Sequence, residues 1–156
     1  MRAYLFIIVL FTSSTFAQGI EHADYHDHHH NEIGIANAVV YSLSEKSTSY
    51  GIHFHYIRSI SESKFGVGLG YERVFDEHKH NTFGLVVMYR PIERWSFSVS
   101  PGLTVEDGDT DARFSVHIET AYEFEFKDFH IGPVLAFAHD KEDVHFSTGL
   151  HIGYGF

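Results

Sequence analysis

The chain contains no cysteine and comparatively few basic side chains. Without cysteine it can form no disulfide, it has no thiolate to act as nucleophile or metal ligand, and a cysteine-anchored lipoprotein is excluded. Among its 156 residues, 11 lysines and arginines stand against 21 aspartates and glutamates. This acidic balance argues against nucleic acid as a partner, because binding to phosphates requires a basic surface.

The chain also lacks an apolar run long enough to cross a membrane as a helix, which takes about 20 residues. Its apolar N-terminal run, residues 3–11, follows Arg2 and is followed by small residues that end at Ala17. This order is typical of a secretory signal peptide, and a retained membrane anchor would need a longer run. We therefore expect a signal peptide over residues 1–17.

Apolar side chains recur at every second position through most of the remaining chain, which is the period of a β-strand. The segments are 33–43, 49–60, 65–75, 82–91, 94–105, 112–125, 128–138 and 144–156. Short polar segments separate them, as turns would. Each segment is long enough for a tilted strand to cross a bilayer, which takes about 9 to 11 residues. The sequence therefore predicts eight membrane-spanning strands.

Aromatic side chains gather at the ends of these segments and aliphatic ones in their middles, an arrangement typical of the girdles of transmembrane barrels. The last segment, which ends on Tyr154 and Phe156, resembles the C-terminal assembly signal of outer-membrane barrel proteins. On these features the chain resembles the small eight-stranded outer-membrane proteins of the OmpX and OmpA membrane-domain type. A soluble β-sandwich is the alternative, but it would need neither a signal peptide nor girdles.

The resemblance implies an all-β fold, an antiparallel up-and-down transmembrane β-barrel over residues 33–156. It also implies a location among the lipids of the outer membrane of a Gram-negative bacterium. The barrel-assembly machinery would recognise the C-terminal strand through Tyr154 and Phe156. Members of this group serve as tethers, narrow pores, adhesins or lipid-modifying enzymes, so the fold by itself selects no function.

Residues 18–32, between the predicted cleavage site and the first strand, form a histidine-rich segment that we expect to be a disordered periplasmic tail. Neutral imidazole is a preferred ligand of Zn²⁺, Ni²⁺ and Cu²⁺. The spacing of these histidines is not that of a closed structural metal site, so we predict that the tail binds metal weakly and without selectivity. An inert solvated linker is the alternative. The candidate ligands are His22, Asp24, His26, Asp27, His28, His29 and His30.

A second polar set falls on the inward face of the predicted strands: His53, His55, Glu72, Arg90, His117, Glu119, Glu123, His130 and His151. An eight-stranded barrel is just wide enough for side chains to fill, so these groups should pair with one another. A four-residue turn at 61–64 would place His53 opposite Glu72, and a two-residue turn at 126–127 would place Glu123 opposite His130. We interpret the set as a structural polar plug, with a metal or proton pathway through the lumen as the alternative.

Together these features predict a barrel that is not an enzyme and whose tail buffers, presents or otherwise handles divalent metal, with a metal-transport protein as the partner implied. The alternatives are a purely structural barrel, a narrow pore and a lipid-modifying enzyme. The last rests on His145 and Ser147, which distantly resemble the His-x-Ser pair of outer-membrane lipid A deacylases. Thr148 stands where that family has asparagine, and both side chains are expected to face inward.

Overall fold

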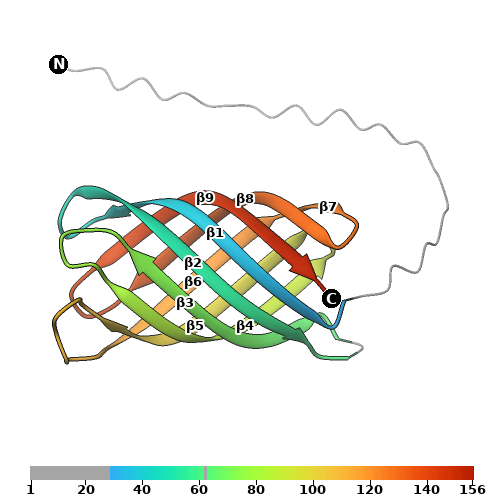
Figure 1. Cartoon of the computed structure of the whole chain (residues 1–156), viewed down its shortest axis with the longest axis horizontal. Helices are drawn as coiled ribbons and strands as arrows, with labels where there is room; N and C mark the ends of the chain where they lie inside the picture. Colours follow the sequence, from blue (N-terminus) through green and yellow to red (C-terminus); the bar gives the residue numbers. More distant parts are fainter. Residues whose placement is uncertain (1–28, 62) are drawn as a thin grey trace, which may run out of the picture.

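The computed structural model describes residues 29–61 and 63–156 and shows a closed antiparallel β-barrel (Figure 1). The predicted signal peptide and the tail up to His28 lie outside the described residues. The strands are β1 (Asn31–Ser42), β2 (Ser47–Ser59), β3 (Phe65–Val74), β4 (Asn81–Ile92), β5 (Trp95–Val105), β6 (Arg113–Tyr122), β7 (Phe124–Phe126), β8 (Phe129–His139) and β9 (Val144–Gly155). Across the described ranges, no helix is long and apolar enough to span a membrane.

Each strand pairs with its neighbour in the chain, and pairing of β1 with β9 closes the sheet. The predicted sixth strand is divided into β6 and β7, which both pair with β8 in a single continuous register. Pro133 lies on β8 opposite this break, and it has no backbone N–H that could donate a hydrogen bond across the ladder. The nine strands therefore build the eight-stranded barrel that the sequence predicts.

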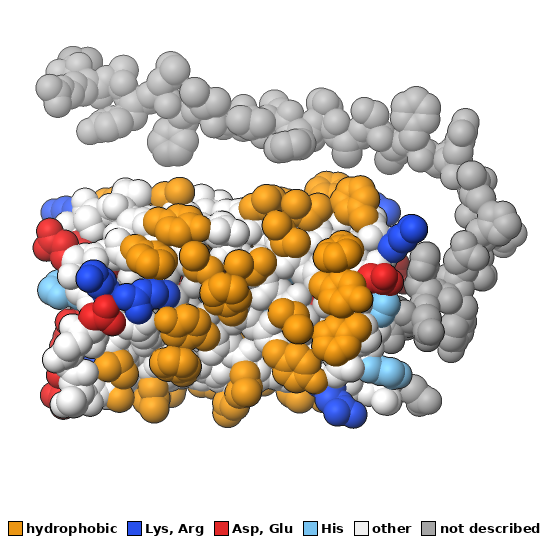
Figure 2. All heavy atoms as spheres, viewed as in Figure 1, with side chains coloured by type: hydrophobic (Ala, Val, Ile, Leu, Met, Phe, Trp, Pro, Cys, Tyr) orange, Lys and Arg blue, Asp and Glu red, His pale blue; other side chains and the backbone are white. Residues whose placement is uncertain are grey.

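Apolar side chains cover the outer wall of the barrel, and charged ones lie toward its two ends (Figure 2). Leu69 and Leu85, near the middle of the wall, are 61% and 62% exposed. Such a continuous apolar surface is unfavourable in water and favourable in lipid, so the fold is that of a transmembrane barrel. Asn37 is the polar exception on the first strand, and it accepts a hydrogen bond of 2.5 Å from the Tyr50 hydroxyl.

The two ends of the barrel differ in their connections. At the end where β1 begins and β9 finishes, which we call the terminal end, the turns are 60–64, 93–94 and 127–128. At the opposite end the connections are 43–46, 75–80, 106–112 and 140–143. The two longest connections, 75–80 and 106–112, and most of the acidic side chains of the connections therefore lie at the opposite end.

Ion pairs tie the connections of the opposite end to one another. The Arg113 guanidinium lies 2.6 Å from Glu106 and 3.0 Å from Glu142. The hydrogen bond from Arg113 holds the pKa of Glu106 below its ordinary value, and the amide of Asn81 does the same for the pKa of Asp107. Both carboxylates therefore favour the folded loops at neutral pH, and this contribution is lost only as the pH falls through their lowered pKa values.

Two predicted details of the fold are wrong. The first strand begins at Asn31, so Glu32, which the sequence pattern assigns to the tail, lies in β1 with its side chain in the lumen. The turn after β7 is Lys127-Asp128, and His130 therefore faces Glu125 across the ladder, not Glu123. Lys127 has a positive φ of 58°, a conformation that tight two-residue hairpin turns require.

Candidate metal centre in the barrel lumen

Ten polar residues project into the barrel from seven strands and from the break between β6 and β7, and we call them the lumen cluster. They are Glu32, His53, His55, Glu72, Arg90, His117, Glu119, Glu123, His130 and His151. Nine of them are buried, and Arg90 is half-buried with 26% of its side chain exposed. Strand alternation explains their facing, because positions two apart, such as His53 and His55 on β2, point the same way.

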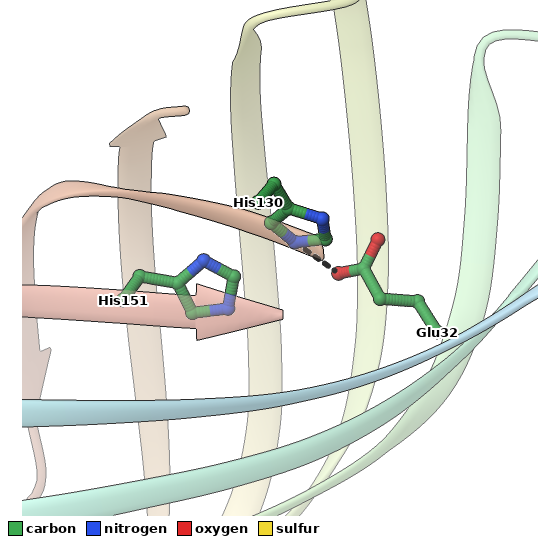
Figure 3. A group of neighbouring side chains, drawn as sticks. All are labelled: Glu32, His130 and His151. Atoms are coloured by element: carbon green, nitrogen blue, oxygen red, sulfur yellow. Dashed lines mark ion pairs between the residues drawn. The ribbon is translucent and has the colours of Figure 1, made fainter. Parts of the chain in front are cut away.

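Glu32, His130 and His151 converge from β1, β8 and β9 in the terminal half of the lumen (Figure 3). One potential ligand atom from each lies within 4.8 Å of the others, and we call these residues the terminal triad. His130 Nε2 is 3.6 Å from Glu32 Oε1. Two imidazoles and one carboxylate are a donor set that suits Zn²⁺ and other divalent transition metals.

His151 is the most deeply buried histidine of the terminal triad, with 1% of its surface exposed. Its Nδ1 lies 3.2 Å from Glu123 Oε1 without the geometry of a hydrogen bond, and its Nε2 has no hydrogen-bond partner among the described residues. Leaving a buried imidazole nitrogen unpaired is unfavourable by about 1 to 3 kcal/mol. A metal ion bound at this nitrogen would remove that penalty.

Two glycines make the space for these imidazoles. A Cβ atom on Gly34 would lie 2.1 Å from His55 Nε2 and 2.6 Å from His151 Nε2. A Cβ atom on Gly153, which pairs with Gly34 across the β1–β9 ladder, would lie 1.8 Å from His130 Nε2. Glycine at these two positions therefore lets the imidazole rings of His55, His130 and His151 lie directly against the backbone of the barrel wall.

The lumen cluster contains more negative than positive charge. Its four carboxylates accompany one guanidinium, which pairs with Glu32 and lies 4.0 Å from Glu123 Oε2. With neutral imidazoles the formal charge is therefore −3. Since buried charges require compensation, this excess of carboxylates favours a cation inside the lumen.

A cavity of about 660 Å³ opens at the terminal end and reaches the terminal triad. Its lining includes Glu32 and His130, and also His29 and His30 from the end of the predicted tail. His29 Nε2 lies 3.4 Å from Asp128 Oδ1 in the β7–β8 turn. An ion in the cavity would therefore meet imidazoles of the tail before it meets those of the lumen.

The other predicted site residues are placed as follows. His22, Asp24, His26, Asp27 and His28 lie outside the described residues, so their metal binding stays a prediction. Tyr154 and Phe156 lie exposed on the outer wall, and the backbone N–H of Phe156 donates to Asn31 O at 2.9 Å. Their recognition by the assembly machinery also stays a prediction.

The two residues behind the enzymatic alternative, His145 and Ser147, face inward on β9, away from lipid. An acidic residue does accompany the histidine, because His145 Nδ1 lies 3.2 Å from Asp143 Oδ2. No contact joins His145 to Ser147 among the hydrogen bonds of the described residues. The pair therefore has no arrangement that would activate the serine.

The predicted pairing of His53 with Glu72 across the β2–β3 ladder is confirmed. The shortest contacts of both side chains nevertheless run across the lumen: His53 Nδ1 lies 3.1 Å from Glu119 Oε2, and Glu72 Oε2 lies 3.7 Å from His117 Nδ1. Glu32 is the member of the lumen cluster that the sequence pattern missed. The signal was present, since Glu32 continues the inward alternation of Gly34 and Ala36.

Comparison with known proteins gives the fold and leaves the activity open. No protein-family model and no curated protein sequence matches the chain. Neisserial surface protein A is similar in structure, with a TM-score of 0.60 and 10% identity over 81% of this chain and 96% of that one. Ail, the attachment invasion locus protein of Yersinia pestis, has a TM-score of 0.52 and 16% identity over 81% and 96%.

A de novo designed transmembrane barrel, TMB2.3, is similar as well, with a TM-score of 0.55 and 13% identity over 83% of this chain and 97% of that one. The chain thus has the fold of the small eight-stranded outer-membrane barrels. Because a designed barrel shares this fold, function has to be argued from the lumen itself.

Proposed function

We propose that this protein is an outer-membrane barrel that binds a divalent transition-metal ion inside its lumen, with Glu32, His130 and His151 as ligands. The observation that carries the proposal is the terminal triad: three buried donor groups from three strands, within 4.8 Å of one another. Both of its histidines have a ring nitrogen without a hydrogen-bond partner among the described residues. The negative charge of the lumen cluster favours a cation there. The ion serves no reaction in this proposal, and the barrel stores or presents it.

The tail would supply the ion. His29 and His30 line the cavity that leads to the terminal triad. Histidines of residues 18–28 would capture Zn²⁺, Ni²⁺ or Cu²⁺ weakly and pass it to the more enclosed site. The short turns of the terminal end support a periplasmic position for that end, since outer-membrane barrels carry short turns inside and longer loops outside. The protein would therefore buffer metal on the periplasmic side.

Replacing Glu32 with glutamine is expected to weaken Zn²⁺ binding by about 10- to 100-fold, since it removes the anionic ligand of the site. Isothermal titration of the folded full chain in detergent at pH 7.5 measures this. Glu125→Gln is the matched control, because Glu125 is an exposed carboxylate that faces His130 across the ladder but lies outside the terminal triad. Equal affinities for E32Q and the unmodified protein would show that the triad holds no metal.

The contribution of the tail is measured by deleting residues 18–28. The deletion stops before Asn31, because removal as far as Glu32 would shorten β1 and remove a lumen ligand. We expect the weak, multiple-site component of the titration to disappear and the tight binding by the lumen to remain. A shortened protein that binds no metal would place all binding in the tail and leave the barrel with a structural role only.

The orientation makes a separate prediction. An epitope inserted just before His29 is expected to be inaccessible to antibody on intact cells and accessible after permeabilisation. The same epitope in loop 106–112 should be accessible on intact cells. The reverse pattern would place the terminal end outside, and the ion would then be taken from the medium.

A further inference from the structure

A second group of potential ligands lies next to the terminal triad, further into the barrel. His53 and His55 from β2 and Glu119 from β6 bring one potential ligand atom each within 4.8 Å of the others. All three side chains are buried, and we call them the inner triad. His53 Nδ1 lies 3.1 Å from Glu119 Oε2. The two triads share no residue, so both can be occupied at once.

His55 connects the two triads. Its Nε2 is 3.3 Å from Glu32 Oε1, and its ring stacks on that of His151 with centroids 5.0 Å apart. On its other side the ring of His53 lies 5.6 Å away, edge to face. An imidazole has two ring nitrogens, and His55 therefore stands where it can contact an ion in either triad.

His117 provides a fourth donor beside the inner triad. Its ring centroid is 5.3 Å from that of His53, the side chain is buried, and its Nε2 has no hydrogen-bond partner among the described residues. Zn²⁺ is bound with four ligands in most structural sites. A shift of the His117 side chain toward the three donor atoms of the inner triad would complete that ligand number.

The charges of this half of the lumen fit one divalent ion. Glu72 and Glu119 contribute two carboxylates beside three histidines, and Arg90, the guanidinium of the lumen cluster, contacts Glu32 and Glu123 instead. With neutral imidazoles the formal charge around the inner triad is therefore −2. One divalent cation cancels it.

Access to the inner triad differs between the two ends. Toward the terminal end lie the terminal triad and the cavity of about 660 Å³. Toward the opposite end, the cavity next to His117 and Glu72 has a volume of about 20 Å³, which holds about one water molecule. An ion would therefore enter and leave the inner triad through the terminal triad.

We propose that the lumen holds two divalent transition-metal ions in line, one in each triad, and that His55 passes an ion between them. The barrel is then a two-ion store that is loaded and emptied from its terminal end. This inference rests on the proposed function, because the terminal triad is the entrance to the inner one.

The test is the number of Zn²⁺ ions retained per folded barrel after gel filtration, measured by elemental analysis. The full chain is used with His22, His26, His28, His29 and His30 replaced by serine, so that the histidines of the tail do not contribute. We expect two retained ions per barrel in this background. The H53N variant and the E32Q variant should each retain one ion, and the variant that carries both substitutions should retain none. Glu119→Gln provides a second inner-triad variant if H53N does not fold, and it should also retain one ion.

The outcomes separate the two proposals. One ion in the background protein, lost in E32Q and kept in H53N and E119Q, would overturn the second site and leave the proposed function intact. Two ions in the background with two in E32Q would overturn the proposed function at the terminal triad. No ion in the background would overturn both.

Discussion

Replacing Arg90 with methionine is expected to lower the free energy of unfolding by about 3 kcal/mol. Arg90 pairs with Glu32 and lies 4.0 Å from Glu123 Oε2, and both carboxylates are buried. Removing one partner of a buried ion pair costs about 3 to 5 kcal/mol, because the other charge stays uncompensated. The lower end of that range applies here, since 26% of the arginine side chain is exposed.

Urea unfolding of the metal-free protein in detergent at pH 8 measures this loss. Arg90→Lys is the matched control, because it keeps the positive charge but loses the planar guanidinium group. We expect it to lower the free energy of unfolding by less than Arg90→Met does. Adding Glu32→Gln to Arg90→Met should restore part of the stability, because it removes the carboxylate that was left without a partner. Equal stabilities for Arg90→Met and the double variant would mean that Arg90 and Glu32 are not coupled.

Replacing Gly68 with alanine is expected to prevent most of the protein from folding into the barrel. A Cβ atom on Gly68 would lie 1.7 Å from the main-chain oxygen of Tyr56 on the neighbouring strand β2. Overpacking costs about 1 to 3 kcal/mol where side chains can adjust. Here the backbone of β2 would have to move, so we expect a loss above that range.

Gly70→Ala is the matched control for Gly68→Ala, two residues further along the same face of β3. Its Cβ atom would lie 3.1 Å from His53 Nε2 and 3.1 Å from Val86 Cγ2, both of them side-chain atoms that can shift. The readout is the folded fraction after refolding into detergent, followed by electrophoresis without heating. If both variants fold equally well, the close approach of β3 to β2 is not needed for the barrel.

Much of this architecture follows from local pattern. Alternation with a period of two fixes which side chains face lipid and which face the lumen, because neighbouring residues of a strand point to opposite sides. That rule alone is enough to place Glu119 and His151 inside the barrel. Turn length then fixes register between consecutive strands, and it correctly places His53 opposite Glu72. The turn after β7 lies one residue later than the pattern predicts, which moves the ladder partner of His130 from Glu123 to Glu125. The two side chains of the predicted pair still lie close, with His130 Nε2 3.9 Å from Glu123 Oε1.

The sequence by itself thus determined the strand count, the inward set and one register, since each depends on residues close together in the chain. Only the tertiary structure decided which inward residues meet. Contacts across the lumen depend on how far each strand is staggered when the sheet closes, and no local pattern encodes that stagger. Closure of β1 onto β9 brings Glu32 to His130 and His151, 98 and 119 residues further along the chain. The same closure turns scattered histidines and glutamates into two triads.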